Sequence, residues 1–140
     1  MADPVSSVRI ARPWTVSVGL GSPDILRIDV SRTVTDSFAV SAAVGFGPLG
    51  AMGSVNGHWH ALRGPSHSLV LATGVSVAPG VAQMAGNGLY VGADANVGWE
   101  YRAPCGFTSR LSVGPAAYYG TERSEFMLAP KGTATLGWSF

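Results

Sequence analysis

Alternation with period two runs through nearly the whole chain and is its most constraining feature. Its clearest stretch covers residues 89–102, where Leu, Val, Ala and aromatic residues occupy one set of alternate positions and mostly Gly, Asp, Asn, Glu and Arg occupy the other. Successive side chains of a β-strand point to opposite faces, so this pattern predicts a strand with one apolar and one polar face. About eight such stretches recur, separated by connections rich in Gly, Pro and Ser such as 21–24 and 103–106. We therefore expect an all-β fold, an up-and-down antiparallel meander of about eight strands.

The composition is unusual for a sheet that faces water. Of the 140 residues, 46% are hydrophobic and 12% are charged, whereas a typical soluble domain has roughly 25% charged residues. No stretch reaches the roughly 20 consecutive apolar residues of a transmembrane helix, because Gly, Ser, Pro or a charged residue interrupts every run. The net charge of +1, without a basic cluster, argues against nucleic acid as a partner. These properties favour a protein that crosses a membrane with strands.

The polar face consists mostly of small residues, where a water-facing sheet would carry Lys, Glu and Arg. Small side chains fit the crowded interior of a narrow barrel. The few ionic groups on this face need partners when buried, so we expect opposite charges on neighbouring strands to pair into a network. The predicted polar residues of the lumen are Arg27, Asp29, Asn56, His58, His60, Asp94, Asn96, Glu100, Arg102, Arg110 and Lys131.

The apolar face carries aromatic residues that fall largely near the ends of the predicted strands. Amphipathic rings at both ends of the strands form the interfacial girdles of transmembrane barrels. A soluble sandwich with core aromatics, or a soluble barrel of the lipocalin kind, is the alternative. The predicted girdle residues are Trp14, Phe38, Phe46, Trp59, Trp99, Tyr101, Phe107, Tyr119, Trp138 and Phe140. We interpret the fold as a transmembrane β-barrel.

The chain reads as one barrel domain with a short extension before it. We assign residues 1–11 to an N-terminal extension and residues 12–140 to the barrel, because no change in composition marks a linker. The first five residues lack the basic start and apolar core of a signal peptide, so we interpret the chain as a mature exported form. An even number of strands places both termini on the periplasmic side.

The last eight residues, Thr133 to Phe140, alternate and end on an aromatic residue. With the strand pattern before it, this segment resembles the small eight-stranded outer-membrane proteins of the OmpA/OmpX type over residues 12–140. The resemblance implies a location in the bacterial outer membrane and contact with membrane lipid or detergent. It also implies recognition of the final strand by the barrel-assembly machinery. The predicted loops are shorter than those of adhesive members of that group, which argues against adhesion carried by loops.

Residues capable of chemistry are few. His58 and His60 share one face and could bind a metal, but no third ligand accompanies them, so we expect no metal and no cofactor. His67 and Ser68 are adjacent and must point to opposite faces, so they cannot act as base and nucleophile. The single cysteine, Cys105, excludes an internal disulfide. We therefore do not expect an enzyme.

Two irregular regions carry further expectations. Pro115 lies inside the seventh predicted strand and would remove a ladder hydrogen bond, so we expect a bulge or an early strand end there. The longer loops are predicted at 78–88 and 120–130 and are candidates for contacts outside the cell. The second loop holds Glu122, Arg123 and Glu125, the only charge cluster of the chain.

Two classes of function stay open. The favoured one is a structural or interaction component of the outer membrane, a monomer whose polar lumen is plugged. The alternative is a small passive pore, which requires continuous water through the lumen. A lipid-modifying barrel enzyme and a soluble lipocalin-like ligand binder are weaker alternatives.

Overall fold

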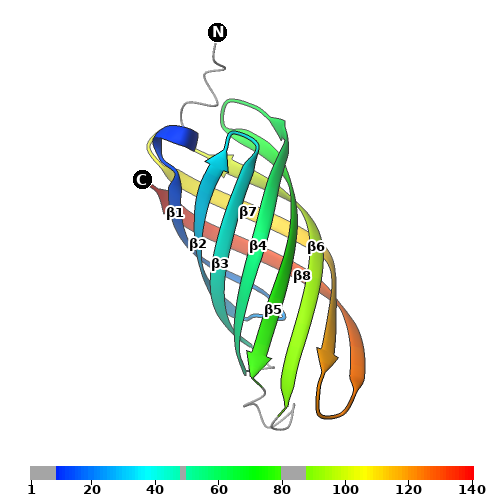
Figure 1. Cartoon of the computed structure of the whole chain (residues 1–140). Helices are drawn as coiled ribbons and strands as arrows, with labels where there is room; N and C mark the ends of the chain where they lie inside the picture. Colours follow the sequence, from blue (N-terminus) through cyan, green and yellow to red (C-terminus); the bar gives the residue numbers. More distant parts are fainter. Residues whose placement is uncertain (1–8, 48–49, 80–87) are drawn as a thin grey trace.

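The computed structural model describes residues 9–47, 50–79 and 88–140 and has the form of a closed barrel of tilted strands (Figure 1). Every strand is antiparallel to its neighbours in the chain, and the last strand pairs with the first. The prediction of an all-β, up-and-down antiparallel barrel of eight strands is confirmed. The strands are β1 (Trp14–Ser22), β2 (Leu26–Thr35), β3 (Phe38–Gly47), β4 (Gly50–Arg63), β5 (His67–Pro79), β6 (Leu89–Arg102), β7 (Phe107–Gly120) and β8 (Glu125–Ser139).

The barrel closes where β1 meets β8. Their pairing runs from Thr15 opposite Ser139 to Ser22 opposite Gly132. Inside the barrel the side-chain hydroxyls of Thr15 and Ser139 are hydrogen-bonded at 2.8 Å across this seam. Because the sheet has no edge strand, its backbone donors and acceptors are satisfied within the wall.

The two ends of the barrel differ. We call the end where β1 begins and β8 ends the proximal end, and the opposite end the distal end (Figure 1). A single helical turn, residues 9–11, precedes β1 at the proximal end. At the distal end β5 to β8 extend beyond the shorter β1 to β3. Among the described residues, no helix is long and apolar enough to cross a membrane.

The polarity of the barrel is inverted relative to a water-soluble fold. Along every strand most of the large apolar side chains point outward and are exposed, and most of the polar ones point inward and are buried. In the described part of the chain, the exposed charged residues on strands are Arg32, Arg63 and Glu125, and all three lie toward strand ends. The middle of the outer wall is therefore free of charge within the described ranges.

The expectation at Pro115 is wrong, because β7 passes through this residue without a bulge. Its register against β6 is the same on either side, with Asp94 opposite Ala116 and Val97 opposite Val113, and only the two positions between make no ladder pair. Pro115 faces outward and lies opposite Pro130 of β8. The bulges are instead near the proximal ends of β2 and β4.

One predicted loop is shorter in the structure. The segment 120–130 was expected to be a loop, yet β7 ends at Gly120 and β8 begins at Glu125, so only 121–124 form the turn. Glu125 pairs with Gly120, and Phe126 pairs with Tyr119. The β7–β8 hairpin therefore continues beyond the part of the barrel in which one face of each strand must be polar. The other predicted loop, 78–88, lies mostly outside the described residues, and its first two residues belong to β5.

The close approach of β6 and β7 at Gly114 allows a test of how tightly the barrel wall is packed. A Cβ added at Gly114 would lie 2.0 Å from the carbonyl oxygen of Ala95 and 2.7 Å from the Cα of Asn96. These are backbone atoms of β6 that cannot rotate away, so we expect Gly114→Ala to destabilise the barrel by about 1 to 3 kcal/mol. The matched control is Gly53→Ala, since a Cβ at Gly53 meets nothing within 4 Å. The measurement is the urea midpoint of folding in detergent for each variant. Equal midpoints would contradict the tight β6–β7 contact.

Candidate functional site

All eleven predicted lumen residues point into the barrel. Nine of them are buried, and Asn96 and Arg110 are half-buried. They divide into a proximal cluster around Glu100, a small central cavity and a distal group of ion pairs.

Glu100 of β6 is fully buried, with 0% of its surface exposed, and is the centre of the proximal cluster. Its Oε2 accepts hydrogen bonds from Arg110 Nη2 at 2.6 Å and Nε at 3.1 Å. Its Oε1 lies 3.3 Å from His60 Nε2 and 3.7 Å from Arg102 Nη2. His60 of β4, Arg102 of β6 and Arg110 of β7 thus converge on one carboxylate.

Arg9 is a member of the proximal cluster that sequence reasoning missed. It is buried although it belongs to the helical turn before β1, and its Nη1 lies 3.4 Å from Glu100 Oε1. Its Nη2 donates to the hydroxyl of Ser68. Burial lowers the pKa of the Arg9 guanidinium from its ordinary value. The residue falls in the assigned N-terminal extension, 1–11, where no strand periodicity exists to show which way a side chain points.

The proximal cluster holds more positive than negative charge. Three guanidinium groups, those of Arg9, Arg102 and Arg110, surround the one carboxylate of Glu100, which leaves two positive charges in excess when His60 is neutral. Removing an ion from water costs several kcal/mol unless charge and hydrogen bonds are both compensated. Within the described residues, part of the positive charge of the cluster is therefore uncompensated.

A chain of hydrogen bonds links the proximal cluster to β3. Arg110 Nη1 lies 3.4 Å from His58 Nδ1, and His58 Nε2 lies 2.9 Å from the hydroxyl of Ser41. A guanidinium only donates, so Nδ1 must accept and the proton of the neutral imidazole sits on Nε2, which donates to Ser41. His58 is thus a bridging group in the lumen wall.

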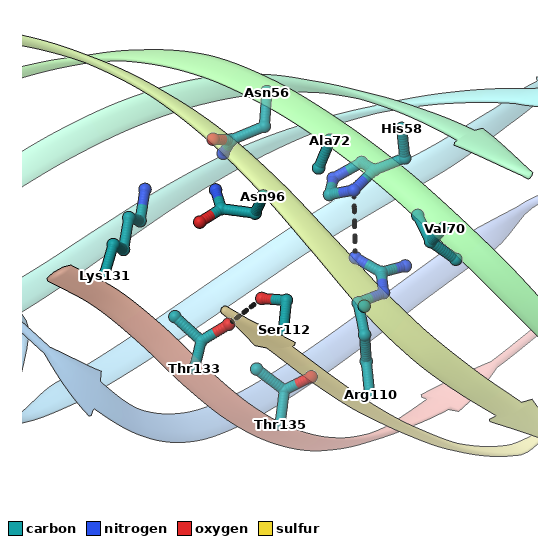
Figure 2. Close-up of a pocket in the computed structure, with 11 residues that line it drawn as sticks. Asn56, His58, Val70, Ala72, Asn96, Arg110, Ser112, Lys131, Thr133 and Thr135 are labelled. Atoms are coloured by element: carbon teal, nitrogen blue, oxygen red, sulfur yellow. Dashed lines mark hydrogen bonds between the residues drawn. The ribbon is translucent and has the colours of Figure 1, made fainter. Parts of the chain in front are cut away.

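A cavity of about 30 Å³ lies below this bridge and separates the two charged regions. Figure 2 shows Arg110 and His58 on one side of it and Lys131, Asn56 and Asn96 on the other. The Ser112 and Thr133 hydroxyls, 2.7 Å apart, form part of its wall. A polar cavity needs roughly 10 to 15 Å³ per water, so this one has room for one or two water molecules.

The distal group consists of two separate sets of ion pairs. Lys131 Nζ lies 2.6 Å from Asp94 Oδ1, and the amide of Asn96 donates to the other oxygen of Asp94. Arg27 lies between two carboxylates, 3.3 Å from Asp29 and 3.4 Å from Asp24. Asp24 is in the turn after β1 and was not predicted as a lumen residue; burial raises the pKa of its carboxyl from the ordinary value.

Apolar side chains gather in the distal lumen and form a cluster that the predicted list of polar lumen residues did not include. Met52, Ala78, Ala116 and Tyr118 are buried together, with Tyr90 and Ala129 packed against them. Gly92 makes room for this cluster, since a Cβ there would lie 2.5 Å from the Tyr118 ring. The signal was present in the sequence, because Tyr90 and Tyr118 fall in the inward phase of their strands.

Within the described residues, neither the His58–His60 pair nor the His67–Ser68 pair is arranged for the chemistry considered from the sequence. In the described ranges, no group of three or more His, Cys, Asp or Glu side chains could hold a metal ion. Ser68 is buried inside the barrel against Arg9. His67 is exposed on the outside, where Trp99 Nε1 donates to its Nδ1 at 3.1 Å. The two residues therefore lie on opposite faces of β5.

The predicted girdle residues lie on the outer wall but are unevenly divided between its ends. Phe46 and Tyr119 lie toward the distal end, and the other eight lie toward the proximal end. All are exposed except Tyr101, which is half-buried with its ring centroid 5.0 Å from that of His67. The aromatic girdle is thus strong at the proximal end and sparse at the distal end.

Neutralising Glu100 gives a test of the proximal cluster. Glu100→Gln keeps the volume but leaves three guanidinium groups in the lumen without a carboxylate, so we expect it to destabilise the barrel by about 3 to 5 kcal/mol. The control is Glu125→Gln, which neutralises an exposed glutamate at the distal end. A urea titration of folding in detergent gives both values. An unchanged midpoint for Glu100→Gln would show that the cluster does not need its carboxylate.

Comparison with known proteins gives no relative on which a function could be based. No family model, no curated protein and no solved structure matches the chain. A functional assignment therefore depends on the geometry of the barrel wall and of the lumen.

Proposed function

We propose that this protein spans a bacterial outer membrane as a closed barrel with a plugged lumen, and that it serves there as a structural or interaction component. The observation that carries the proposal is the inverted polarity of the fold. Apolar side chains cover the outside of every strand, and the ionic groups are held inside. This is the arrangement of a barrel whose surrounding solvent is lipid.

The energetics of the outer wall support a lipid environment. Val18, Leu20 and Leu111 are between 55% and 63% exposed, and similar side chains surround them on all sides. Burying such a side chain is worth about 1.5 to 3 kcal/mol, and soluble monomers rarely expose a contiguous apolar patch beyond roughly 600 Å². A wall with this surface on all eight strands is unfavourable in water.

The strand lengths suit a bilayer. The shortest strand, β1, has nine residues, which rise about 30 Å at about 3.3 Å per residue. A tilt of about 45° reduces this to about 21 Å, close to the apolar band of roughly 25 Å around transmembrane barrels. Arg32 lies 5.4 Å from the Trp14 ring centroid. Arg32 and the proximal aromatic residues would then occupy the membrane interface.

The contents of the lumen favour an anchor over a pore or a ligand carrier. The central cavity of about 30 Å³ is far below the roughly 300 Å³ at which small-molecule pockets begin. Below it, Tyr118 and Met52 belong to the apolar cluster that fills the distal lumen. We infer that this filling interrupts a water path through the described part of the lumen, and the small cavity leaves no space for a lipocalin-type ligand.

The C-terminal strand supports an interaction with the barrel-assembly machinery. Trp138 and Phe140 are exposed on the outer face of the last strand, at the proximal end. The resemblance to small outer-membrane barrels implies that this strand is the assembly signal. Both termini would then be on the periplasmic side.

Introducing a charge in the middle of the outer wall distinguishes a membrane protein from a soluble one. Val18 lies at the centre of β1, so Val18→Arg should destabilise folding into phosphatidylcholine vesicles by about 2 to 4 kcal/mol if the wall faces lipid. The control Glu125→Arg changes an exposed residue at the distal strand end and should cost less than about 1 kcal/mol. Urea-dependent folding into vesicles gives both values. Full tolerance of Val18→Arg would indicate that the wall faces water.

Conductance distinguishes the plugged anchor from the pore. We expect the folded protein to produce no discrete current steps in planar bilayers, because the Glu100 cluster and the distal apolar cluster fill the lumen on either side of the small cavity. Single-channel recording over a range of voltages is the measurement. Reproducible steps that vanish in Arg110 or Glu100 variants would replace the anchor with the pore.

A further inference from the structure

The last strand continues beyond the closed part of the wall. The pairing of β1 with β8 stops at the distal end with Ser22 opposite Gly132. The pairing of β7 with β8 continues to the first residue of β8, Glu125. Residues 125–131 of β8 therefore have a neighbouring strand on one side only within the described ranges. They form part of the β7–β8 hairpin, which extends at the distal end in Figure 1.

The turn that follows β1 does not cover the open side of β8. The Ile25 amide donates to the Phe46 carbonyl of β3 at 2.9 Å. A Cβ added at Gly47, the last residue of β3, would lie 2.1 Å from the carbonyl oxygen of Pro23. Both contacts place the β1–β2 turn against β3. Among the described residues, β8 thus has a free edge at its distal end.

The register shows which backbone groups point at the free edge. Trp14 of β1 and Phe140 exchange two backbone hydrogen bonds, of 3.2 and 2.9 Å. Backbone groups alternate in direction along an antiparallel strand, and the register of β8 is constant against both neighbours. Phe126, Leu128 and Pro130 therefore direct their backbone groups toward the side on which β1 has ended. Phe126 and Leu128 each offer an N–H and a C=O, whereas proline offers only a C=O.

Neither lipid nor water suits this edge on its own. Unpaired backbone N–H and C=O groups are costly in hydrocarbon, so the edge is unfavourable inside the bilayer. In water the backbone groups are solvated, but the side chains of Phe126 and Leu128 are 66% and 71% exposed. An added strand would pair the backbone groups and cover part of both side chains. Free apolar edges are known templates for such pairing.

The free edge is complementary to itself. Antiparallel pairing of two copies centred on Met127 places Phe126 of each copy opposite Leu128 of the other. Every N–H and C=O that these residues direct at the edge then has a partner. Pairing centred on Leu128 would instead place Phe126 opposite Pro130, which cannot donate, and would leave the Phe126 carbonyl unpaired. Pro130 therefore favours the register centred on Met127.

We propose that the distal edge of β8 binds the same edge of a second copy of this chain by antiparallel pairing centred on Met127. The two-fold axis of such an isologous pair is perpendicular to the sheet and reverses every direction within it. The two barrels therefore point in opposite directions with their distal ends together. The pair joins barrels in two opposed membranes, an inference that rests on the proposed membrane location.

Engineered disulfides test the pairing and its register in detergent. In a Cys105→Ser background, Met127→Cys faces its own counterpart in a pair that is not hydrogen-bonded, with Cα atoms about 4.5 Å apart, within reach of a disulfide. We expect a mild oxidant to convert this variant to a covalent dimer. The control Glu125→Cys is four positions out of register with its counterpart, about 13 Å along the strand, and should stay monomeric. Absence of the Met127→Cys dimer, or equal dimer formation by both variants, would overturn the proposal.

Vesicle clustering tests whether the pair joins two membranes. The full chain would be reconstituted into phosphatidylcholine vesicles by detergent removal, which leaves some distal ends on the outside. We expect the light-scattering radius to rise severalfold over that of protein-free vesicles, and Leu128→Lys to abolish the rise by placing charges at the pair. The control Leu89→Lys makes the same change at an exposed position of β6, which has a strand on both sides, and should retain clustering. Clustering that persists in Leu128→Lys would contradict the proposed edge.

The heat-dependent gel mobility of the same vesicle samples separates this inference from the proposed function. Inserted protein that does not cluster vesicles would overturn the pairing and leave the membrane anchor intact. Protein that does not insert would overturn both, because pairing between opposed membranes requires insertion.

Discussion

The pairing of β1 with β8 is the constraint on which the rest of the structure depends. It converts a meander of eight strands into a wall without an edge, so that backbone polar groups are satisfied regardless of what surrounds the barrel. Only then can the outward positions be wholly apolar without exposing unpaired amides. The same closure creates an interior isolated from the outside, and the polar phase of every strand must be satisfied there.

The lumen meets this requirement in three different ways along its axis. At the proximal end Glu100 contacts basic side chains from three strands and from the N-terminal turn. Beside the cavity, which has room for one or two waters, Lys131 and Asp94 form a separate ion pair of the distal group. At the distal end Tyr118 and Met52 fill the interior with apolar groups. Charged groups fill the lumen at one end and apolar groups fill it at the other. This filling is why the proposed role as an anchor fits better than transport.

Much of this arrangement could be predicted because strand periodicity is a local property. Each inward or outward assignment, such as Glu100 inside and Trp99 outside, depends only on neighbours in the same strand. The errors arose where another constraint replaced periodicity. Phe126, Met127 and Leu128 are apolar in both phases and lie in the predicted loop, yet the structure pairs them with β7 as a hairpin extension. A lone proline at position 115 was expected to break the strand register, but the register continues there. The Pro115 ring points outward, and Pro130 lies opposite it on β8.

The partners within the lumen were beyond sequence reasoning, since they depend on the shear and closure of the barrel. Nothing in the chain order indicates that Arg9 reaches Ser68, or that Thr15 meets Ser139. The distal tyrosines were visible in the inward phase, but only the folded barrel shows that they pack with Met52 and Ala78 rather than line a water-filled channel.

The central claim is that the wall faces lipid, and refolding from urea tests it most directly. The protein would be diluted into detergent micelles or into plain buffer and followed by far-ultraviolet circular dichroism, with gel mobility compared between boiled and unboiled samples. The account predicts a β-rich spectrum and a heat-dependent mobility shift in detergent alone, with aggregation in buffer. A monodisperse β-protein in plain buffer would contradict it and make the inverted barrel a soluble one.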